Sequence, residues 1–241
     1  MENKLRVSLV IPAHNEEKYI ANCLSAAIKN SRGRFFEIMV IDNASSDRTG
    51  DEASKFPGVR VVREEKKGLT QARERGFQEA RGDILAYIDA DTLMPEHWFE
   101  ILEKEFETHK NLAALSGPYD YYDVPKWQRL LIKCYWTISG LLAYRIAGYL
   151  VVGGNFAIKR DILEKMHGFD TSIAFYGEDT NIARRASKFG KVKFLPKFFI
   201  YTSGRRFHGQ GFFKTAVIYT ANFFSEAIIH KPITKKYKDI R

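Results

Sequence analysis

Four short runs rich in Val and Ile, each followed by a polar segment, limit the possible folds of this chain more than any other feature. The runs lie at Val7–Ile11, Glu37–Ile41, Val59–Val62 and Ile84–Ile88. The segments between them have helical character and span Glu16–Lys29, Ser46–Lys55 and Leu69–Ala80. Strands that alternate with helices form βαβ units with right-handed crossovers. The sequence therefore predicts an α/β fold with a mostly parallel sheet.

Polar residues follow the end of each of these runs, in segments 12–16, 42–47, 65–68 and 89–91. Right-handed crossovers place the carboxyl ends of parallel strands at one edge of the sheet, where open α/β sheets hold ligands. A purely structural scaffold does not require polar chemistry at four consecutive strand ends. We therefore expect a binding site at this edge.

Asp89 and Asp91 stand one residue apart directly after the run that ends at Ile88. Mg²⁺ and Mn²⁺ prefer oxygen ligands and are commonly held by one or two carboxylates together with substrate phosphates. The pair therefore favours a metal-bridged diphosphate. Two solvated carboxylates in a turn are the alternative.

Composition indicates one large globular domain, or one domain with an appended piece. The chain has 241 residues, and its two cysteines, Cys23 and Cys134, are not at zinc-ligand spacing, which favours a reducing compartment. A net charge of +9 favours acidic partners such as phosphates, anionic lipid or nucleic acid.

The first residues lack the pattern of a secretory signal. The apolar stretch 130–152 contains Lys133 and Arg145, which argues against a spanning helix.

The pattern changes after Pro95. We expect a helix over Pro95–Thr108, a long amphipathic stretch over Lys126–Tyr149 and a strand over Val151–Ile158. A helix that opens at Glu178 and a strand over Val192–Leu195 follow. The predicted domain spans residues 1–204, with a nucleotide-binding half to about 94 and an acceptor-side half from about 95. We expect residues 205–241 to form a basic segment and helix that covers the active site or associates with a membrane.

Spaced motifs between about residues 5 and 195 together resemble the family 2 glycosyltransferases. The motifs are Val10–Glu17, Val40–Asp47, Lys67–Gly68 with Ala72, Arg73 and Gly76, Asp89–Asp91, Gly153–Asn155, Gly168–Asp170 and Glu178–Asp179. The resemblance implies a GT-A fold, with a Rossmann-like, mostly parallel sheet, flanking helices and a C-terminal acceptor-side portion.

The resemblance also implies which residues bind the nucleotide. The candidates for the nucleobase are Pro12, His14, Glu16 and Asp42, and those for the nucleotide or its phosphates are Lys67, Gly68 and Arg73. A carboxylate such as Asp42 can accept hydrogen bonds from a uracil imide or from guanine. Asp42 could instead cap the following helix, and Arg73 could be solvated or salt-bridged.

By the same resemblance, Asp91 ligates a divalent cation, Mn²⁺ or Mg²⁺, while Asp89 touches the ribose or coordinates the cation through water. His208 would complete the metal shell, although a lone His is more often structural. Arg205 and Arg206 would pair with the diphosphate, since guanidinium groups bind phosphate oxygens well.

The catalytic base implied by the resemblance is Asp179, with Glu178 as an acceptor contact or a neighbour of the base. Acidic residues at a helix start are also explained by capping and by the helix dipole. Gly153, Gly154 and Asn155 would lie under the donor sugar and the acceptor, with a β-bulge as the alternative.

The implied reaction is the transfer of one sugar from a UDP- or GDP-sugar to an acceptor hydroxyl with inversion. The chain lacks the Gln-x-x-Arg-Trp signature of processive relatives. It departs from the haloacid dehalogenase phosphatase pattern and lacks the glycine-rich loop of sugar-nucleotide pyrophosphorylases. A catalytically silent module that binds a nucleotide sugar or a membrane is the remaining alternative.

We expect a cytoplasmic protein, either free or peripheral at the cytoplasmic face of a membrane. Segment 127–149 mixes Trp, Tyr, Leu and Ile with basic residues, and Lys235, Lys236 and Lys238 add charge near the end of the chain. Such a combination suits an anionic bilayer and a lipid-linked acceptor. The alternative for 127–149 is an interior helix or a dimer contact. No nucleic-acid signature is present, and the sequence leaves the oligomeric state open.

Overall fold

The four Val- and Ile-rich runs form adjacent parallel strands, as the sequence predicts. In the computed structural model, which describes residues 5–173, 177–205 and 225, these strands are β1 (Val7–Ala13), β2 (Glu37–Asn43), β3 (Val59–Glu64) and β4 (Ile84–Ile88). The helices between them are α1 (Ile20–Ser31), α2 (Thr49–Ser54) and α3 (Leu69–Glu79). α2 starts at Thr49, and Asp47 accepts a hydrogen bond from the Thr49 amide.

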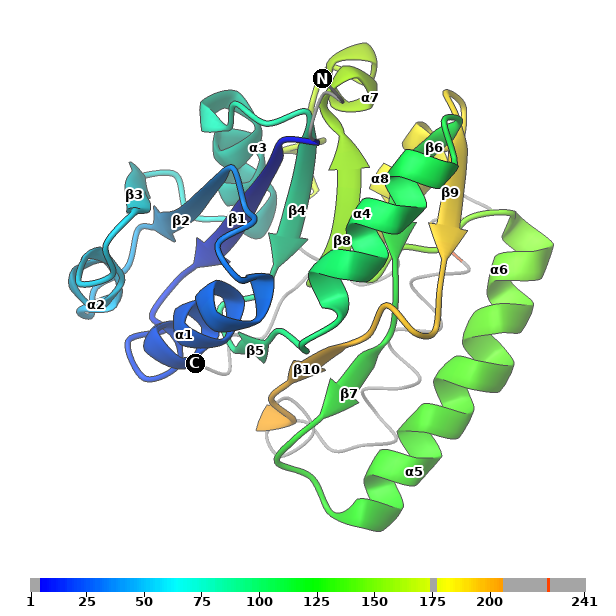
Figure 1. Ribbon diagram of the computed structural model, residues 1–241, viewed down its shortest axis with the longest axis horizontal. Coiled ribbons are helices and arrows are strands. Elements are labelled where there is room, and N and C mark those ends of the chain that lie inside the picture. Colours follow the sequence, from blue (N-terminus) through cyan, green and yellow to red (C-terminus); the bar gives the residue numbers. More distant parts are fainter. Residues whose placement is uncertain (1–4, 174–176, 206–224, 226–241) are drawn as a thin grey trace.

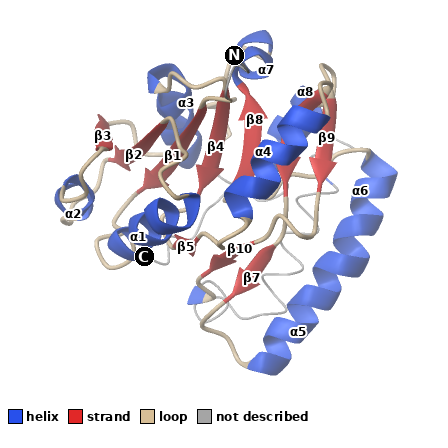
Figure 2. Cartoon of the chain, in the orientation of Figure 1, coloured by secondary structure: helices blue, strands red, loops and turns tan. Residues whose placement is uncertain are grey.

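Beyond β4 the sheet adds three strands that do not all run in the same direction, and its order is β3-β2-β1-β4-β8-β6-β9 (Figures 1 and 2). The added strands are β6 (Leu112–Ser116), β8 (Asn155–Lys159) and β9 (Lys191–Phe194). β8 runs antiparallel to both β4 and β6, whereas β9 is parallel to β6. The sheet is thus mostly parallel, as predicted, with one reversed strand in its centre.

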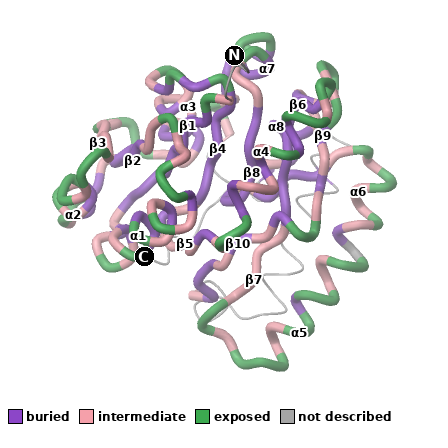
Figure 3. The backbone as a smooth tube through the Cα atoms, viewed as in Figure 1, coloured by how far each residue is buried: buried purple, intermediate pink, exposed green. Residues whose placement is uncertain are grey.

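Helices cover both faces of this sheet because successive strand side chains point to opposite sides. On one face, Leu9 and Ile11 of β1 pack with α1 and with α4 (Trp98–Thr108). On the other face, Val10 packs with α3, α7 (Arg160–Lys165) and α8 (Glu178–Ala186). The centre of the sheet is buried from both sides (Figure 3).

Close packing of α3 onto the sheet requires the glycine at position 76. A Cβ atom there would overlap the Val10 side chain. Without that atom α3 can lie directly on β1, which brings the buried residues of α3, among them Arg73, beneath the carboxyl ends of the strands.

A second, three-stranded sheet consists of β5 (Thr92–Leu93), β10 (Ile200–Thr202) and β7 (Tyr119–Tyr121). The sequence did not predict it, because strands of two or three residues carry too little periodic pattern. The sheet lies next to the segment that carries Asp91, at the carboxyl edge of the large sheet (Figure 1).

The predicted amphipathic stretch forms α5 (Lys126–Tyr135), a π-helical turn η1 (Trp136–Gly140) and α6 (Leu141–Ala147). Its inner side packs through Trp136, Leu141 and Tyr144 onto a small cluster around Phe194. Among the residues that the structure describes, no helix is long and apolar enough to span a membrane.

Several predicted starts are wrong. The helix expected from Glu16 begins at Ile20, and the helix expected from Pro95 begins at Trp98. The strand expected from Val151 starts only at Asn155, because Gly153 and Gly154 form a tight turn that is closed by a bond from the Asn155 amide to the Val152 carbonyl.

Candidate functional site

Most of the predicted nucleotide-binding residues lie in the last residues of β1 and β2 or in the loops that follow β1 and β3. Pro12 and His14 are buried, and His14 Nδ1 lies 2.7 Å from the carbonyl oxygen of Asn43 at the end of β2. The Asn43 side chain accepts a hydrogen bond from the Gly68 amide at 2.7 Å and donates one to the Lys66 carbonyl at 2.7 Å. These bonds hold the three loops together. Asn43 was not singled out as a site residue, although it follows Asp42 directly.

Asp42 is nearly buried and carries an ion pair that the sequence analysis missed. Arg63 Nη1 lies 2.7 Å from Asp42 Oδ2, and the Ser45 amide is 3.3 Å from Oδ1. Arg63 stands opposite Asp42 in the register of β2 and β3, so pairing of the strands brings the two together. Lys67 is exposed in the loop that follows β3.

The two aspartates after β4 have different partners. Asp89 accepts a hydrogen bond from the Tyr119 hydroxyl at 3.0 Å, and its other carboxylate oxygen lies 3.7 Å from Arg73 Nη2. Asp91 instead pairs with Arg205, whose Nη2 lies 3.0 Å from Asp91 Oδ2. The same strand end therefore presents one carboxylate to each of two arginines.

Arg205 links Asp91 to Glu16, a residue predicted from the first strand end. Its guanidinium makes a two-pronged ion pair with the Glu16 carboxylate, with one contact at 2.9 Å, and lies over the Tyr19 ring. Burial opposes the charge, but the bond to Glu16 and the charge of Asp91 dominate and raise the pKa of Arg205. This residue was predicted to bind a diphosphate, and here it neutralises two carboxylates.

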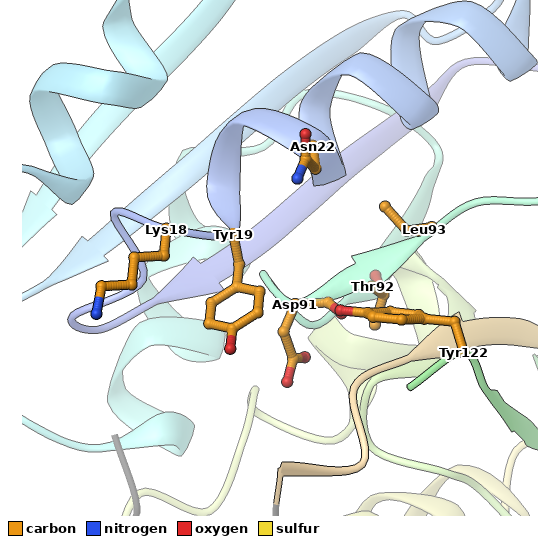
Figure 4. Close-up of a pocket in the computed structure, with 7 residues that line it drawn as sticks. All are labelled: Lys18, Tyr19, Asn22, Asp91, Thr92, Leu93 and Tyr122. Atoms are coloured by element: carbon orange, nitrogen blue, oxygen red, sulfur yellow. The ribbon is translucent and has the colours of Figure 1, made fainter. Parts of the chain in front are cut away.

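A pocket of about 370 Å³ opens beside Asp91, between the start of α1 and β5. Figure 4 shows the Asp91 carboxylate next to the Tyr19 ring, with Tyr122 on the other side. The remaining lining residues are Lys18, Asn22, Thr92 and Leu93. Small polar groups can therefore reach Asp91 from solvent.

Asp89 and Asp91 fit a divalent cation by their chemistry. Both offer carboxylate oxygens, and the guanidinium of Arg205 already stands against Asp91 as a positive group. Within the described part of the chain, no three His, Cys, Asp or Glu side chains are grouped as a metal site. Two protein carboxylates suffice when substrate phosphates complete the shell. Arg206 and the predicted ligand His208 lie outside the described residues.

Arg73, predicted to contact the nucleotide, is instead buried within the protein. Its side chain is 1% exposed and pairs with Glu178 at the start of α8. It also donates a hydrogen bond to the carbonyl oxygen of Gly153 at 2.6 Å. The guanidinium thus has protein partners in place of the phosphates that we expected.

Glu178 and Asp179 begin α8, as the sequence predicts. Burial raises the pKa of Glu178 to about 7, although Arg73 acts in the opposite direction. Burial also raises the pKa of Asp179, whose Oδ1 accepts a hydrogen bond from the Thr180 amide at 2.8 Å. A carboxylate with a raised pKa is a stronger base, so Asp179 has the property that proton removal needs.

The turn at Gly153 and Gly154 lies against both acidic groups. A Cβ atom on Gly153 would stand 2.6 Å from a Glu178 carboxylate oxygen, and one on Gly154 would overlap Asp89. The neighbouring Asn155 is fully buried. Its side-chain amide accepts a hydrogen bond from the Trp98 ring and donates to the carbonyl oxygens of Gly117 and Phe198. Contact of Asn155 with a sugar would require these bonds to break.

Comparison with known proteins gives a consistent result. The model of the family described as glycosyl transferase family 2 matches residues 8–167. The chain is 32% identical over 177 residues to a dolichol-phosphate mannosyltransferase from Pyrococcus furiosus, covering 66% of this chain and 48% of that protein. It is 30% identical over 217 residues to the probable glycosyltransferase YdaM from Bacillus subtilis, covering 81% of this chain and 50% of that protein. The chain thus spans about half the length of these relatives.

Solved structures share the fold. A mannosyltransferase from Pyrobaculum calidifontis in complex with GDP-Man and Mn²⁺ aligns with a TM-score of 0.71 at 20% identity, over 95% of this chain and 64% of that one. A glucosyl-3-phosphoglycerate synthase from Mycobacterium tuberculosis, in complex with Mn²⁺, UDP and phosphoglyceric acid, aligns with a TM-score of 0.65 at 17% identity, over 94% of this chain and 78% of that one.

Proposed function

Because the chain belongs to the family 2 glycosyltransferases, we propose that it transfers one sugar from a UDP- or GDP-sugar to an acceptor hydroxyl with inversion at the anomeric carbon. One observation carries the proposal. The buried guanidinium of Arg73 lies 3.7 Å from Asp89 and pairs with Glu178, the neighbour of Asp179. The carboxylate after β4 and the start of α8 therefore belong to one site.

In this proposal Asp179 removes the proton of the acceptor hydroxyl. The acceptor oxygen forms a bond to the anomeric carbon while the bond from that carbon to the diphosphate oxygen breaks, and the electron pair leaves with the nucleoside diphosphate. The raised pKa of Asp179 supports the base role. Gly153 and Gly154 support the arrangement of the site, because backbone without side chains can lie directly against Asp89 and Glu178.

Asp91, with Asp89, would hold a divalent cation, Mn²⁺ or Mg²⁺. When bound, the cation neutralises charge that develops on the departing diphosphate. Arg205 would pair with the same diphosphate, and Asp42, His14 and the loop at Gly68 would receive the nucleoside. Since Asp42 is paired with Arg63, a base that binds there must share or replace that partner.

An assay over UDP- and GDP-sugars, with Mn²⁺ and a mixture of hydroxyl acceptors, tests the proposal. We expect release of nucleoside diphosphate that depends on both acceptor and metal. The Asp91→Asn variant should fold but lose most metal-dependent turnover, because an amide is a poorer ligand for a hard cation. Nucleotide binding by the wild-type protein without any turnover would favour the silent binding module.

A membrane surface is the partner that the outer face of α5, η1 and α6 favours. Its large apolar side chains include Trp127 at 59% and Ile146 at 72% exposure; Leu130, Leu131, Ile138 and Leu142 are also exposed. Residues 126–147 contain four basic residues and no acidic one. An amphipathic helix with these properties lies in the interface of an anionic bilayer. We propose that the protein docks there and acts on a lipid-linked acceptor.

Flotation with vesicles that contain anionic lipid, at low and high salt, tests this docking. We expect binding at low salt that weakens as salt screens the basic residues. Leu142→Ser should reduce binding, whereas Phe189→Ser, which removes another exposed apolar side chain after α8, should not. Equal behaviour of the two variants would refute docking through this face. A dimer held by the face would instead show a mass that depends on concentration without lipid.

A further inference from the structure

Arg73 is among the largest fully buried side chains that the structure describes. It projects from α3 and contacts three other segments: the Glu178 carboxylate at the start of α8, the carbonyl oxygen of Gly153 at 2.6 Å, and Asp89 at 3.7 Å. Its guanidinium also lies 5.5 Å from the centre of the Phe156 ring. Four parts of the chain thus converge on one cationic group.

The segments that Arg73 joins leave no room for another side chain between them. Cβ atoms on Gly153 and Gly154 would press on the Glu178 and Asp89 carboxylates. The Tyr119 hydroxyl closes the group, since it donates to Asp89 and accepts from the Gly154 amide at 2.8 Å. The position of the glycine turn therefore depends on the position of both carboxylates.

A buried charge is costly, so its retention calls for a reason in addition to stability. Arginine presents several donors in a flat, rigid fork, whereas lysine presents one compact ammonium group. The fork holds its donors in fixed, widely separated directions, which suits a carbonyl and two carboxylates that approach from different elements. The contacts of Arg73 therefore fix the positions of Glu178, Asp89 and the Gly153 carbonyl relative to one another.

We propose that Arg73 is a positioning residue that sets the start of α8, and with it Asp179, relative to Asp89 and the glycine turn. This inference rests on the proposed sugar transfer. In it Arg73 does not touch the donor, and its effect on turnover passes through Glu178. The role differs from the phosphate contact that the sequence indicates, because the side chain is enclosed by protein.

The test is the Arg73→Lys variant of the full chain, which keeps the charge and loses the fork. The probe is Mn²⁺ with UDP or GDP, whichever raises the melting temperature of the wild-type protein more. We expect affinity for the nucleoside diphosphate to stay within about threefold and kcat to fall by on the order of 10²-fold, the usual cost of a misplaced catalytic group. Hydrogen exchange should accelerate at 152–155 and 178–182, and stay unchanged in β1 and β2.

Arg160→Lys is the matched control, because Arg160 is half-buried and binds the backbone carbonyls of Ala80 and Gly82 away from the site. We expect it to lower the melting temperature without changing kcat. If Arg73→Lys weakens nucleotide binding at constant kcat, Arg73 contacts the phosphates and the inference is overturned. A lower melting temperature with kcat and local exchange unchanged also overturns it. Absence of wild-type transfer with every donor refutes the proposed function, and the exchange comparison then still decides whether Arg73 fixes α8.

Discussion

Replacement of Arg205 by Gln should strengthen the binding of Mn²⁺ alone and weaken the binding of Mn²⁺ with a nucleoside diphosphate. In the structure the Arg205 guanidinium lies 3.0 Å from Asp91 Oδ2 and forms a two-pronged pair with Glu16. A cation that binds to Asp91 must displace this group. The proposed diphosphate contact, in contrast, needs the guanidinium.

The magnitude follows from the contact with Asp91. The two side chains are 22% and 11% exposed, so the pair is largely shielded from solvent. A hydrogen bond between charged groups contributes about 1.5–3 kcal/mol. At the lower end of that range, its removal raises the affinity for Mn²⁺ about tenfold, because 1.4 kcal/mol corresponds to one factor of ten. Loss of a phosphate contact of similar strength lowers the affinity for the nucleotide complex about tenfold or more.

Titration of Mn²⁺, followed by the paramagnetic resonance signal of the free ion, measures the first effect, and calorimetry with Mn²⁺ and UDP or GDP measures the second. Arg6→Gln is the control, because it removes the same charge from a pair with Asp83 at the opposite end of β1 and β4. It should change neither affinity. If Arg205→Gln binds Mn²⁺ no more tightly than the wild-type protein, while remaining folded, the guanidinium does not compete at Asp91 and the reasoning fails.

Three further predictions concern turnover. Asp179→Asn should keep nucleotide affinity and lower kcat by on the order of 10²- to 10⁴-fold, the usual scale of lost general base catalysis. Steady-state kinetics measures kcat, and calorimetry measures nucleotide affinity. An unchanged kcat would remove Asp179 from the base role. Burial raises the pKa of Asp179, and the base acts when ionised. We therefore expect kcat/KM to rise with pH, with an apparent pKa above the ordinary aspartate value of about 3.9. A pH profile without this rise contradicts the assignment. Gly154→Ala should lower the free energy of unfolding by about 1–3 kcal/mol and reduce turnover, because the added Cβ would overlap Asp89 and the Tyr119 hydroxyl. Denaturant unfolding and the transfer assay measure the two effects. Wild-type stability and turnover in this variant would contradict the prediction.

The strands β1 to β4 could be predicted from sequence because each contains a short run rich in Val, Ile and similar residues, a local pattern that is typical of strands. The start of α8 was predictable from two adjacent acidic residues, since helix starts favour them locally. The position of Asp89 and Asp91 at the carboxyl end of β4 could also be predicted, because they directly follow a buried strand.

The burial and the ion-pair partners of the charged side chains depended on the tertiary structure. Arg73 lies on a predicted helix of ordinary pattern, and only the approach of α3 to β1 at Gly76 and the arrival of α8 bury it. Arg205 reaches Glu16 across 189 positions of the chain. Asp42 meets Arg63 only through the register of β2 and β3. Local periodicity determines which residues enter the core, but charges act through space, so their partners are decided by which distant segments the folded sheet brings to one edge.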